Sequence, residues 1–348
     1  MTSEIDERSL DLRPGQDGGG EPPTLAGRLV SLGTHYGLLV LFAAVVIFFA
    51  VYGTTSASYL SRANVVTLFG NNAVVCVVAL AALVTLTAGY IDLSVGAVTG
   101  VASLIVAGGV SKDGWPLALA VPLAIAVAMV LGLVNGVLVA RFRLSSIVTT
   151  LGMSTALSGV MLWYTKGATV GAGLPASLLN FGSLNWLGIP RVTLVMIPII
   201  VICWFVLENT PFGRYLQAIA SNSRSSRLVG INVDRSVLIA FTFSGFLSGV
   251  AGVLLTARSG AADATTGPSY LFLALAGVFL GATTIHPGRP NVWGTVVGIF
   301  FVAFVVSGLS LLGASSWAPD LFNGLILVAA AGLASVFARR RGGGPRML

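Results

Sequence analysis

Polar groups capable of chemistry are scarce in this sequence, and the most isolated of them is a carboxylate. Residues 87–98 read TAGYIDLSVGAV, so Asp92 stands among small and apolar residues. An aspartate near the centre of a bilayer costs about 2.5–3.5 kcal/mol on insertion scales, so other groups must offset its burial. Three roles are open: an N-cap for the next helix, a polar lining for a hydrophilic solute, and an acid in a proton relay.

Small residues flank the aspartate on both sides. Gly89, Ser94 and Gly96 allow the backbone to break, turn or pack closely beside the carboxylate. A proton relay needs a chain of titratable groups, which the apolar stretches around Asp92 do not supply. We therefore expect Asp92 to hold a break between two helices beside a solute path, with backbone N–H groups stabilising its charge.

A second polar set lies in residues 132–152, GLVNGVLVARFRLSSIVTTLG. Asn135 stands between Gly132 and Gly136, which permit close helix contact, and its amide can hydrogen-bond across that contact. The hydroxyls of Thr149 and Thr150 follow. Packing between helices and lining of a polar path are both open for these side chains. The candidates for a solute path are Asp92, Ser94, Asn135, Thr149 and Thr150.

The third notable stretch is a basic loop, residues 208–235, ENTPFGRYLQAIASNSRSSRLVGINVDR. Asn222 is a good N-cap and Gly230 a good residue to end a helix, so SRSSRLV between them predicts two helical turns. Such a short helix is marginal alone in water, which favours docking on a cytoplasmic partner over a solvated loop. The docking candidates are Gly213, Arg214, Asn222, Arg224, Arg227, Leu228 and Gly230.

Signatures of catalysis are missing from the sequence. Neither Lys112 nor Lys166 has the Gly-Lys-Ser/Thr context of a P-loop, and no Gly-x-Ser-x-Gly elbow occurs. His35 and His286 lie far apart and outside any metal-ligand spacing. We therefore assign no catalytic residue, metal ligand or cofactor to this chain, and any ATP and Mg²⁺ would belong to a partner subunit.

The composition explains where these groups must sit. Hydrophobic residues make up 55% of the 348 positions and charged residues only 9%, far below the roughly 25% of soluble domains. The net charge of +7 comes from basic residues in short loops, which favours a membrane over nucleic acid as the partner. Cys76 and Cys203 fall inside apolar runs and define no disulfide framework.

Apolar runs predict an all-α polytopic membrane protein of about ten transmembrane helices. We expect a disordered cytoplasmic tail over 1–34, a transmembrane domain over 35–338 and a basic cytoplasmic tail over 339–348. The expected spans are about 36–53, 71–89, 93–110, 116–139, 145–163, 193–207, 237–257, 269–284, 292–312 and 320–338. VGAVTGV (95–101) and WGTVVGI (293–299) are similar enough to raise a possible internal repeat of two halves.

Charge placement predicts that both termini lie in the cytoplasm. Ten spans put Arg62, Lys112, Lys166, Arg191 and Arg258 outside, which leaves 14 of the 19 basic residues inside, as the positive-inside rule requires. Removing one span would reverse every later loop.

Four motifs in order resemble the membrane permease subunit of ABC importers for monosaccharides, of the ribose/xylose type. These are TAGYIDLSVGAV, GLVNGVLVARFRLSSIVTTLG, FGRYLQAIASNSRSSRLVGINVDR and FSGFLSGVAGVLLTARSG, and the similarity runs over about residues 60–338. The resemblance implies a permease homodimer in the prokaryotic plasma membrane. It also implies a cytoplasmic ATP-binding cassette ATPase docked near 222–230 and an extracytoplasmic sugar-binding protein.

The sequence departs from that resemblance at three places. GPSYLFLALAGVFLGATTI lacks the acid usual in the eighth span, HPGRPNVWG replaces a Gly-Gly-Arg-Gly turn, and Arg224 stands where an acid is usual in the docking helix. The competing hypothesis is an ion- or proton-coupled secondary transporter with Asp92 as its coupling group. A membrane-embedded enzyme is disfavoured because intramembrane His, Cys and acids are scarce.

Overall fold

The computed structural model describes residues 25–340, which form an almost entirely helical chain. The helices are α1 Leu25–Val51, α2 Arg62–Thr87, α3 Val95–Ser111, α4 Leu117–Ala140, α5 Ser146–Thr165, α6 Ala176–Ser183, α7 Arg191–Trp204, α8 Pro211–Leu228, α9 Val233–Ser259, α10 Thr266–Gly281, α11 Val292–Leu311 and α12 Trp317–Arg340. A π-helical turn η1, Phe205–Asn209, extends α7. Strands β1 Asn185–Trp186 and β2 Ile189–Pro190 form a small antiparallel hairpin.

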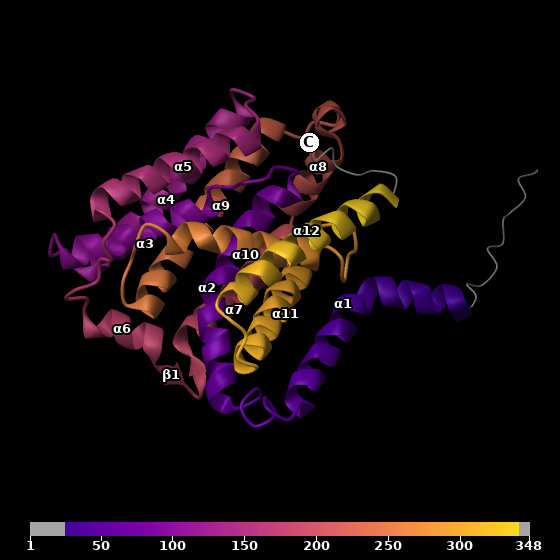
Figure 1. Cartoon of the computed structure of the whole chain (residues 1–348). Helices are drawn as coiled ribbons and strands as arrows, with labels where there is room; N and C mark the ends of the chain where they lie inside the picture. The colour runs from indigo at the N-terminus through magenta and orange to yellow at the C-terminus, as the bar shows by residue number, and fades with distance from the viewer. Residues whose placement is uncertain (1–24, 341–348) are drawn as a thin grey trace, which may run out of the picture.

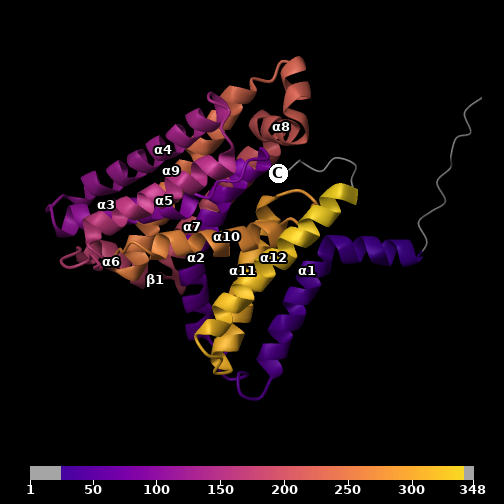
Figure 2. The same ribbon diagram turned by 45° about the horizontal axis from the view of Figure 1, so that its top comes forward.

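Helix α2 lies at the centre of the molecule, and the other long helices pack around it (Figure 1). Helices α3, α4, α5 and α9 form a group on one side, and α1, α11 and α12 lie on the other. Helix α10 lies between the groups and contacts α2, α3, α11 and α12, as the turned view in Figure 2 also shows. The core is therefore built around α2 and α9, with nearly every residue from Ala73 to Ala88 buried.

Glycines bring α4 and α9 into direct backbone contact. A Cβ on Gly132 would overlap the carbonyl oxygen of Phe241, and one on Gly245 would overlap that of Ala128. On Gly136 it would lie 3.1 Å from the Phe241 Cβ. The close contact expected around Asn135 is therefore present, and small residues are what permit it.

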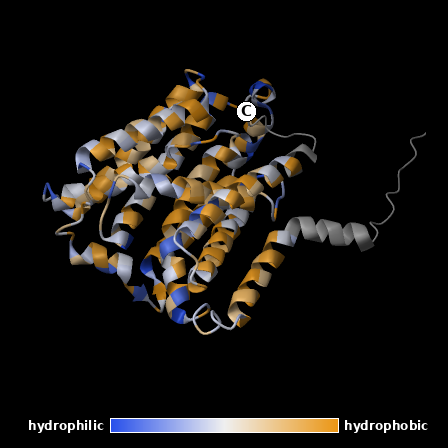
Figure 3. Ribbon diagram, in the orientation of Figure 1, coloured by the Kyte–Doolittle hydropathy of each residue, from blue (hydrophilic) through white to orange (hydrophobic). Residues whose placement is uncertain are grey.

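The surface of the molecule matches a membrane environment. Hydrophobic residues cover most helix surfaces, while hydrophilic residues gather at helix ends and on α8 (Figure 3). Among the described residues, α2, α4, α5, α7 with η1, α9, α11 and α12 are long and apolar enough to cross a bilayer. Residues 36–51 of α1, together with α3 and α10, are shorter apolar helices. These findings support an all-α polytopic membrane protein.

The expected spans coincide with helices, but some boundaries were wrong. Helix α2 begins at Arg62, whereas the span was expected to begin near 71. The prediction was late because Asn64, Asn71 and Asn72 lower the hydropathy of the first part of the helix. The Asn64 amide is nevertheless satisfied, donating to the Tyr59 carbonyl at 2.7 Å and to the Ser307 hydroxyl at 3.0 Å. A helix can therefore begin before its apolar stretch when its polar side chains have partners on a neighbouring helix.

The terminal tails fall largely outside the described residues. Residues 1–24 and 341–348 are not described, and α1 begins at Leu25, before the expected boundary at 35. Helix α12 similarly continues through residue 340, past the expected start of the basic tail. Helix α6 and the hairpin, within the loop 166–190, were not predicted. The possible internal repeat stays a prediction: Gly96 packs on Gly267 and Gly294 on Gly281, at opposite ends of α10.

Candidate functional site

Asp92 lies in the non-helical segment 88–94 that connects α2 to α3, and it is buried. Its Oδ1 accepts hydrogen bonds from the Ser94 N–H at 2.9 Å and the Ser94 O–H at 2.6 Å. Its Oδ2 accepts from the Ser244 O–H of α9 at 3.4 Å. A buried carboxylate is tolerated when such donors satisfy it, and here three do so.

We expected backbone N–H groups to be the main hydrogen-bond donors to Asp92, and this was wrong. Helix α3 begins at Val95 with Ser94 at the N-cap position, so Asp92 does not cap α3 and receives one backbone N–H rather than several. Serine hydroxyls supply the remainder, and Ser244 comes from a helix about 150 residues away in sequence. Sequence reasoning missed Ser244, although it lies in the FSGFLSG stretch. Asp92 therefore ties the break between α2 and α3 to α9.

Asn135 and Thr150 extend this hydrogen-bond network, whereas Thr149 does not. The Asn135 Nδ2 donates to the Ser94 Oγ at 2.8 Å, and its Oδ1 has no partner among the described residues. The Thr150 Oγ1 accepts from the Leu93 N–H at 2.9 Å and donates to the Ser146 carbonyl. No hydrogen bond joins the Thr149 hydroxyl to the network. Four of the five path candidates thus meet around one backbone break.

The docking segment, which we define as residues 222–230, comprises the second half of α8 and the two residues that follow it. Asn222 has extended dihedrals (φ −157°, ψ 100°) that interrupt α8, and its Oδ1 accepts from the Ser225 N–H at 3.0 Å. Gly230 has a left-handed φ of +86°. The Gly230 N–H bonds to the Arg227 carbonyl and the Ile231 N–H to the Ser226 carbonyl, a Schellman ending. Both ends lie where the sequence placed them.

The first half of α8 was expected to be part of a loop and is instead a packed helix. Gly213 is buried, and a Cβ there would overlap the Leu207 carbonyl of η1, so Gly213 is a packing residue rather than a docking residue. Arg214 is exposed. At the other end of this half, a Cβ on Gly89 would lie 3.2 Å from the Cα of Ala220. Helix α8 therefore rests directly on the segment that carries Asp92.

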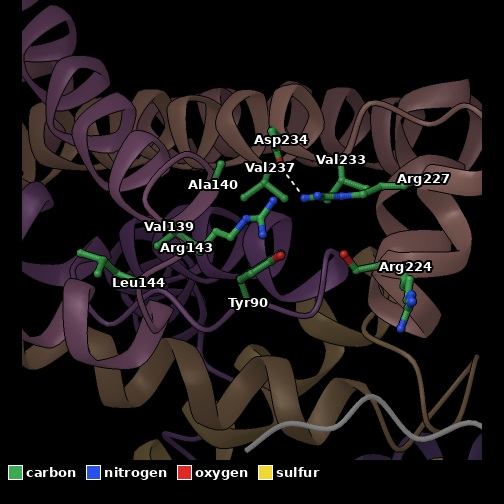
Figure 4. Close-up of a pocket in the computed structure, with 11 residues that line it drawn as sticks. Tyr90, Val139, Ala140, Arg143, Leu144, Arg224, Arg227, Val233, Asp234 and Val237 are labelled. Atoms are coloured by element: carbon green, nitrogen blue, oxygen red, sulfur yellow. Dashed lines mark hydrogen bonds and ion pairs between the residues drawn. The ribbon is translucent and has the colours of Figure 1, made fainter.

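An open cavity of about 350 Å³ separates the docking segment from the membrane helices. Its walls come from the 88–94 segment, the end of α4, the turn after α4, the docking segment and the start of α9. In Figure 4, Arg143 and Tyr90 point towards an ion pair in which Arg227 donates to Asp234 at 2.5 Å, whereas Arg224 points away. Burial raises the pKa of Tyr90 despite the opposing effect of Arg227, so its hydroxyl is a neutral donor.

Two apolar side chains project from the tip of the docking segment. Leu228 is 84% exposed and Val229 is 77% exposed. In the chain, both directly follow the polar stretch from Asn222 to Arg227. Exposed apolar side chains with a charged rim are typical of a protein interface. Among the side chains that the structure describes, no group of three or more His, Cys, Asp or Glu is placed to hold a metal ion.

Comparison with known proteins shows the family to which the chain is similar. Residues 64–331 match the family described as branched-chain amino acid transport system / permease component. The chain is 31% identical to a ribose import permease protein of Haemophilus influenzae over 83% of this chain and 90% of that protein. The counterpart in Bacillus subtilis is 33% identical over 87% and 92%.

A third relative transports a different solute. The autoinducer 2 import system permease protein of Photorhabdus laumondii is 31% identical over 82% of this chain and 85% of that protein. No solved structure matches the chain.

Proposed function

Because this chain belongs to the family of transport-system permease components, we propose that it forms the membrane path for a ribose-like monosaccharide or related polyol. The chain is a transport subunit of an ABC importer, not an enzyme, and a multi-pass protein of the prokaryotic plasma membrane. The observation that carries the choice of solute is similarity to two ribose import permeases over more than four fifths of the chain.

We infer that ten helices cross the membrane, with both termini in the cytoplasm. The seven long apolar helices and the three shorter ones together make ten. Under this arrangement α8 and its arginines face the cytoplasm, while α6 and the hairpin face outwards. Helices α3 and α10, with 17 and 16 residues, reach about 25 Å, so they cross where the bilayer is thin or where protein covers their ends.

The hydrogen-bond network around Asp92 is proposed to border the solute path. A sugar presents hydroxyls that donate and accept, and Asn135 holds a buried amide oxygen without a partner among the described residues. A passing hydroxyl would satisfy that oxygen. Asp92 itself is already occupied by serine donors, so its role is to hold the break in shape.

The docking segment is proposed to bind a cytoplasmic ATPase subunit that holds the ATP and Mg²⁺. Support comes from Leu228 and Val229, exposed apolar residues in a cytoplasmic setting, with Arg224 beside them. Contact between Ala220 and Gly89 gives the ATPase a mechanical link to the Asp92 segment. A change of docking position on ATP binding would then reach the solute path through packed backbone.

A second copy of the chain is proposed to cover α5. This helix is the least apolar of the seven long apolar helices, yet little of it is buried. A helix facing lipid should be among the most apolar, so protein or the solute path is a better neighbour. Gly152 and Gly159 have no atoms nearby that a Cβ would meet, which leaves room for close approach of another helix.

ATP-driven uptake in vesicles tests the proposed function. The chain would be reconstituted with a candidate ABC ATPase and a candidate sugar-binding protein, and uptake of labelled ribose would be followed with and without ATP. We expect accumulation only when all three proteins and ATP are present. Uptake driven by a proton or sodium gradient without the ATPase would contradict the proposal, and competition by unlabelled pentoses, hexoses and polyols would define the solute.

A further inference from the structure

The turn between α4 and α5 holds an arginine in an unusual backbone conformation. Arg143 has a φ of 57°, in the left-handed region that non-glycine residues seldom adopt. Glycine would adopt it without strain, since the penalty arises from the Cβ. A strained residue is a reason to ask what its side chain does. Here that side chain points into the cavity beside the docking segment (Figure 4).

The charges that line this cavity do not balance. Arg143, Arg224 and Arg227 carry positive charge, and Asp234 is the acid in the wall. Asp234 is already bonded to Arg227. No hydrogen bond or ion pair joins the Arg143 guanidinium to another described residue. Arg224 likewise has no ion pair with another described residue. A cavity lined by two unpaired arginines and a neutral phenol donor, Tyr90, is chemically suited to an anion.

We propose that the cavity receives an acidic side chain of the ATPase partner, with Arg143 as a second docking element. The inference rests on the proposed function, because the docking segment forms one wall of the cavity. A partner that covers Leu228 and Val229 would lie beside its mouth. Arg143 can hold a carboxylate by two parallel N–H donors, and Tyr90 can donate a further hydrogen bond.

This contact would give the partner a second connection to the solute path. Tyr90 lies two residues before Asp92 in the same segment. The turn that carries Arg143 joins α4, which holds Asn135, to α5, which holds Thr150. An acid drawn into the cavity would therefore touch the segments on both sides of the hydrogen-bond network, in addition to the contact between Ala220 and Gly89.

Arg143→Gly is a discriminating variant because it removes the charge and also relieves the backbone. We expect its thermal stability to equal or exceed that of the parent chain. Arg141→Gly is the matched control, since Arg141 is exposed in the same turn but does not line the cavity. Arg143→Glu tests whether a negative charge in the cavity repels the acidic side chain of the partner. The probe is the ABC ATPase that supports uptake in the reconstituted vesicles, titrated onto permease in nanodiscs of neutral phosphatidylcholine at several salt concentrations.

We expect Arg143→Gly to weaken ATPase binding about tenfold at low salt and Arg143→Glu to weaken it further, with less than a twofold change for Arg141→Gly. The difference between parent and Arg143→Gly should shrink as salt screens it. Equal effects of the two glycine variants would overturn the proposal. So would an effect of Arg143 seen only with phosphatidylglycerol, because the cavity would then hold a lipid phosphate.

A separate variant distinguishes failure of this inference from failure of the proposed function. Leu228→Asp, at the exposed tip of the docking segment, should abolish ATPase binding if the segment docks at all. Loss of binding in Leu228→Asp with unchanged binding in Arg143→Gly would reject only the cavity. Unchanged binding in both would reject the docking segment as well.

Discussion

At the scale of single residues, the decisive feature is a buried carboxylate whose three hydrogen-bond donors come from two parts of the chain. Asp92 accepts from Ser94 beside it and Ser244 on α9, and Ser94 in turn accepts from Asn135 on α4. Hydrogen bonds to a charged group contribute about 1.5–3 kcal/mol each, so the three donors can offset the cost of burial. The carboxylate needs no chemical role to be retained.

We expect Asp92→Asn to fold and transport with little dependence on pH. An asparagine oxygen still accepts from the Ser94 N–H and O–H, whereas Asp92→Leu would leave Ser94 and Ser244 without acceptors. Uptake by both variants, followed between pH 6 and 8, is the measurement. Normal uptake by the parent with loss of proton dependence in Asp92→Asn would instead identify a relay.

Asp263, in the loop between α9 and α10, offers a pH test. Partial burial raises its pKa, but hydrogen bonds from Thr266 and Thr265 outweigh this and lower the pKa to about 2. A carboxylate with a depressed folded-state pKa stabilises the fold above its unfolded pKa of about 4, and that stability is lost as pH falls towards 2. The melting temperatures of parent and Asp263→Ala should therefore differ at pH 7 and converge below pH 4. A constant difference would contradict this assignment.

At the scale of elements, glycines decide how close two helices come. Helices α4 and α9 touch backbone to backbone at Gly132 and Gly245, and this contact brings Asn135 and Ser244 to the same break. A larger side chain would push the helices apart and separate the donors from Asp92. The hydrogen-bond network thus depends on residues that carry no polar group.

Gly245→Val should destabilise the protein severely. Its side chain would overlap the backbone of α4, which cannot move without disturbing the core, so a cost of several kcal/mol is expected. Gly324→Val, at an open glycine on α12, is the control because no atom lies within 4 Å of the added Cβ. Thermal unfolding in detergent compares the two, and similar melting temperatures would show that α4 and α9 are not in contact.

The docking segment depends on its cap at Gly230. Valine there would pay about 1–2 kcal/mol for the left-handed φ of +86°, whereas asparagine adopts this region readily. We expect Gly230→Val to reduce stimulation of the ATPase by the permease and Gly230→Asn to preserve it. ATP hydrolysis by the assembled complex is the measurement, and equal activity in both variants would argue against a docking role.

At the scale of the whole molecule, the exposed face of α5 is the feature that one copy leaves unexplained. The helix combines low hydropathy with little burial, and it carries glycines in open space. Helix α12 is also little buried but is more apolar than α5. The proposed dimer therefore places α5, rather than α12, against protein.

Gly159→Ile should shift the chain from dimer to monomer without loss of the monomer fold. The added Cβ has no atom within 4 Å in one copy, whereas the isoleucine side chain would obstruct close approach of a second copy. Gly324→Ile, at an equally open glycine on α12, is the control. Mass measurement in nanodiscs reads the stoichiometry. A monomeric parent chain, or an unaffected dimer in Gly159→Ile, would remove α5 from the interface.

The sequence by itself determined the class of protein, the approximate helices and the ends of the docking segment. Hydropathy over about 20 residues marks a span, and Asn222 and Gly230 act on backbone groups a few positions away. These signals are local, so they can be read without knowing the fold. The predicted start of α2 was wrong because Ser307, the hydrogen-bond partner of Asn64, is remote in sequence.

Only the tertiary structure decided which residues meet. Ser244 is bonded to Asp92 across 152 positions, Arg143 faces Arg227 across a cavity, and Gly213 is buried against η1 instead of lying on a docking surface. None of these follows from neighbours in the chain, because helix packing sets them. In a membrane, that packing depends on where small residues let backbones approach, and the partner of each small residue lies on another helix.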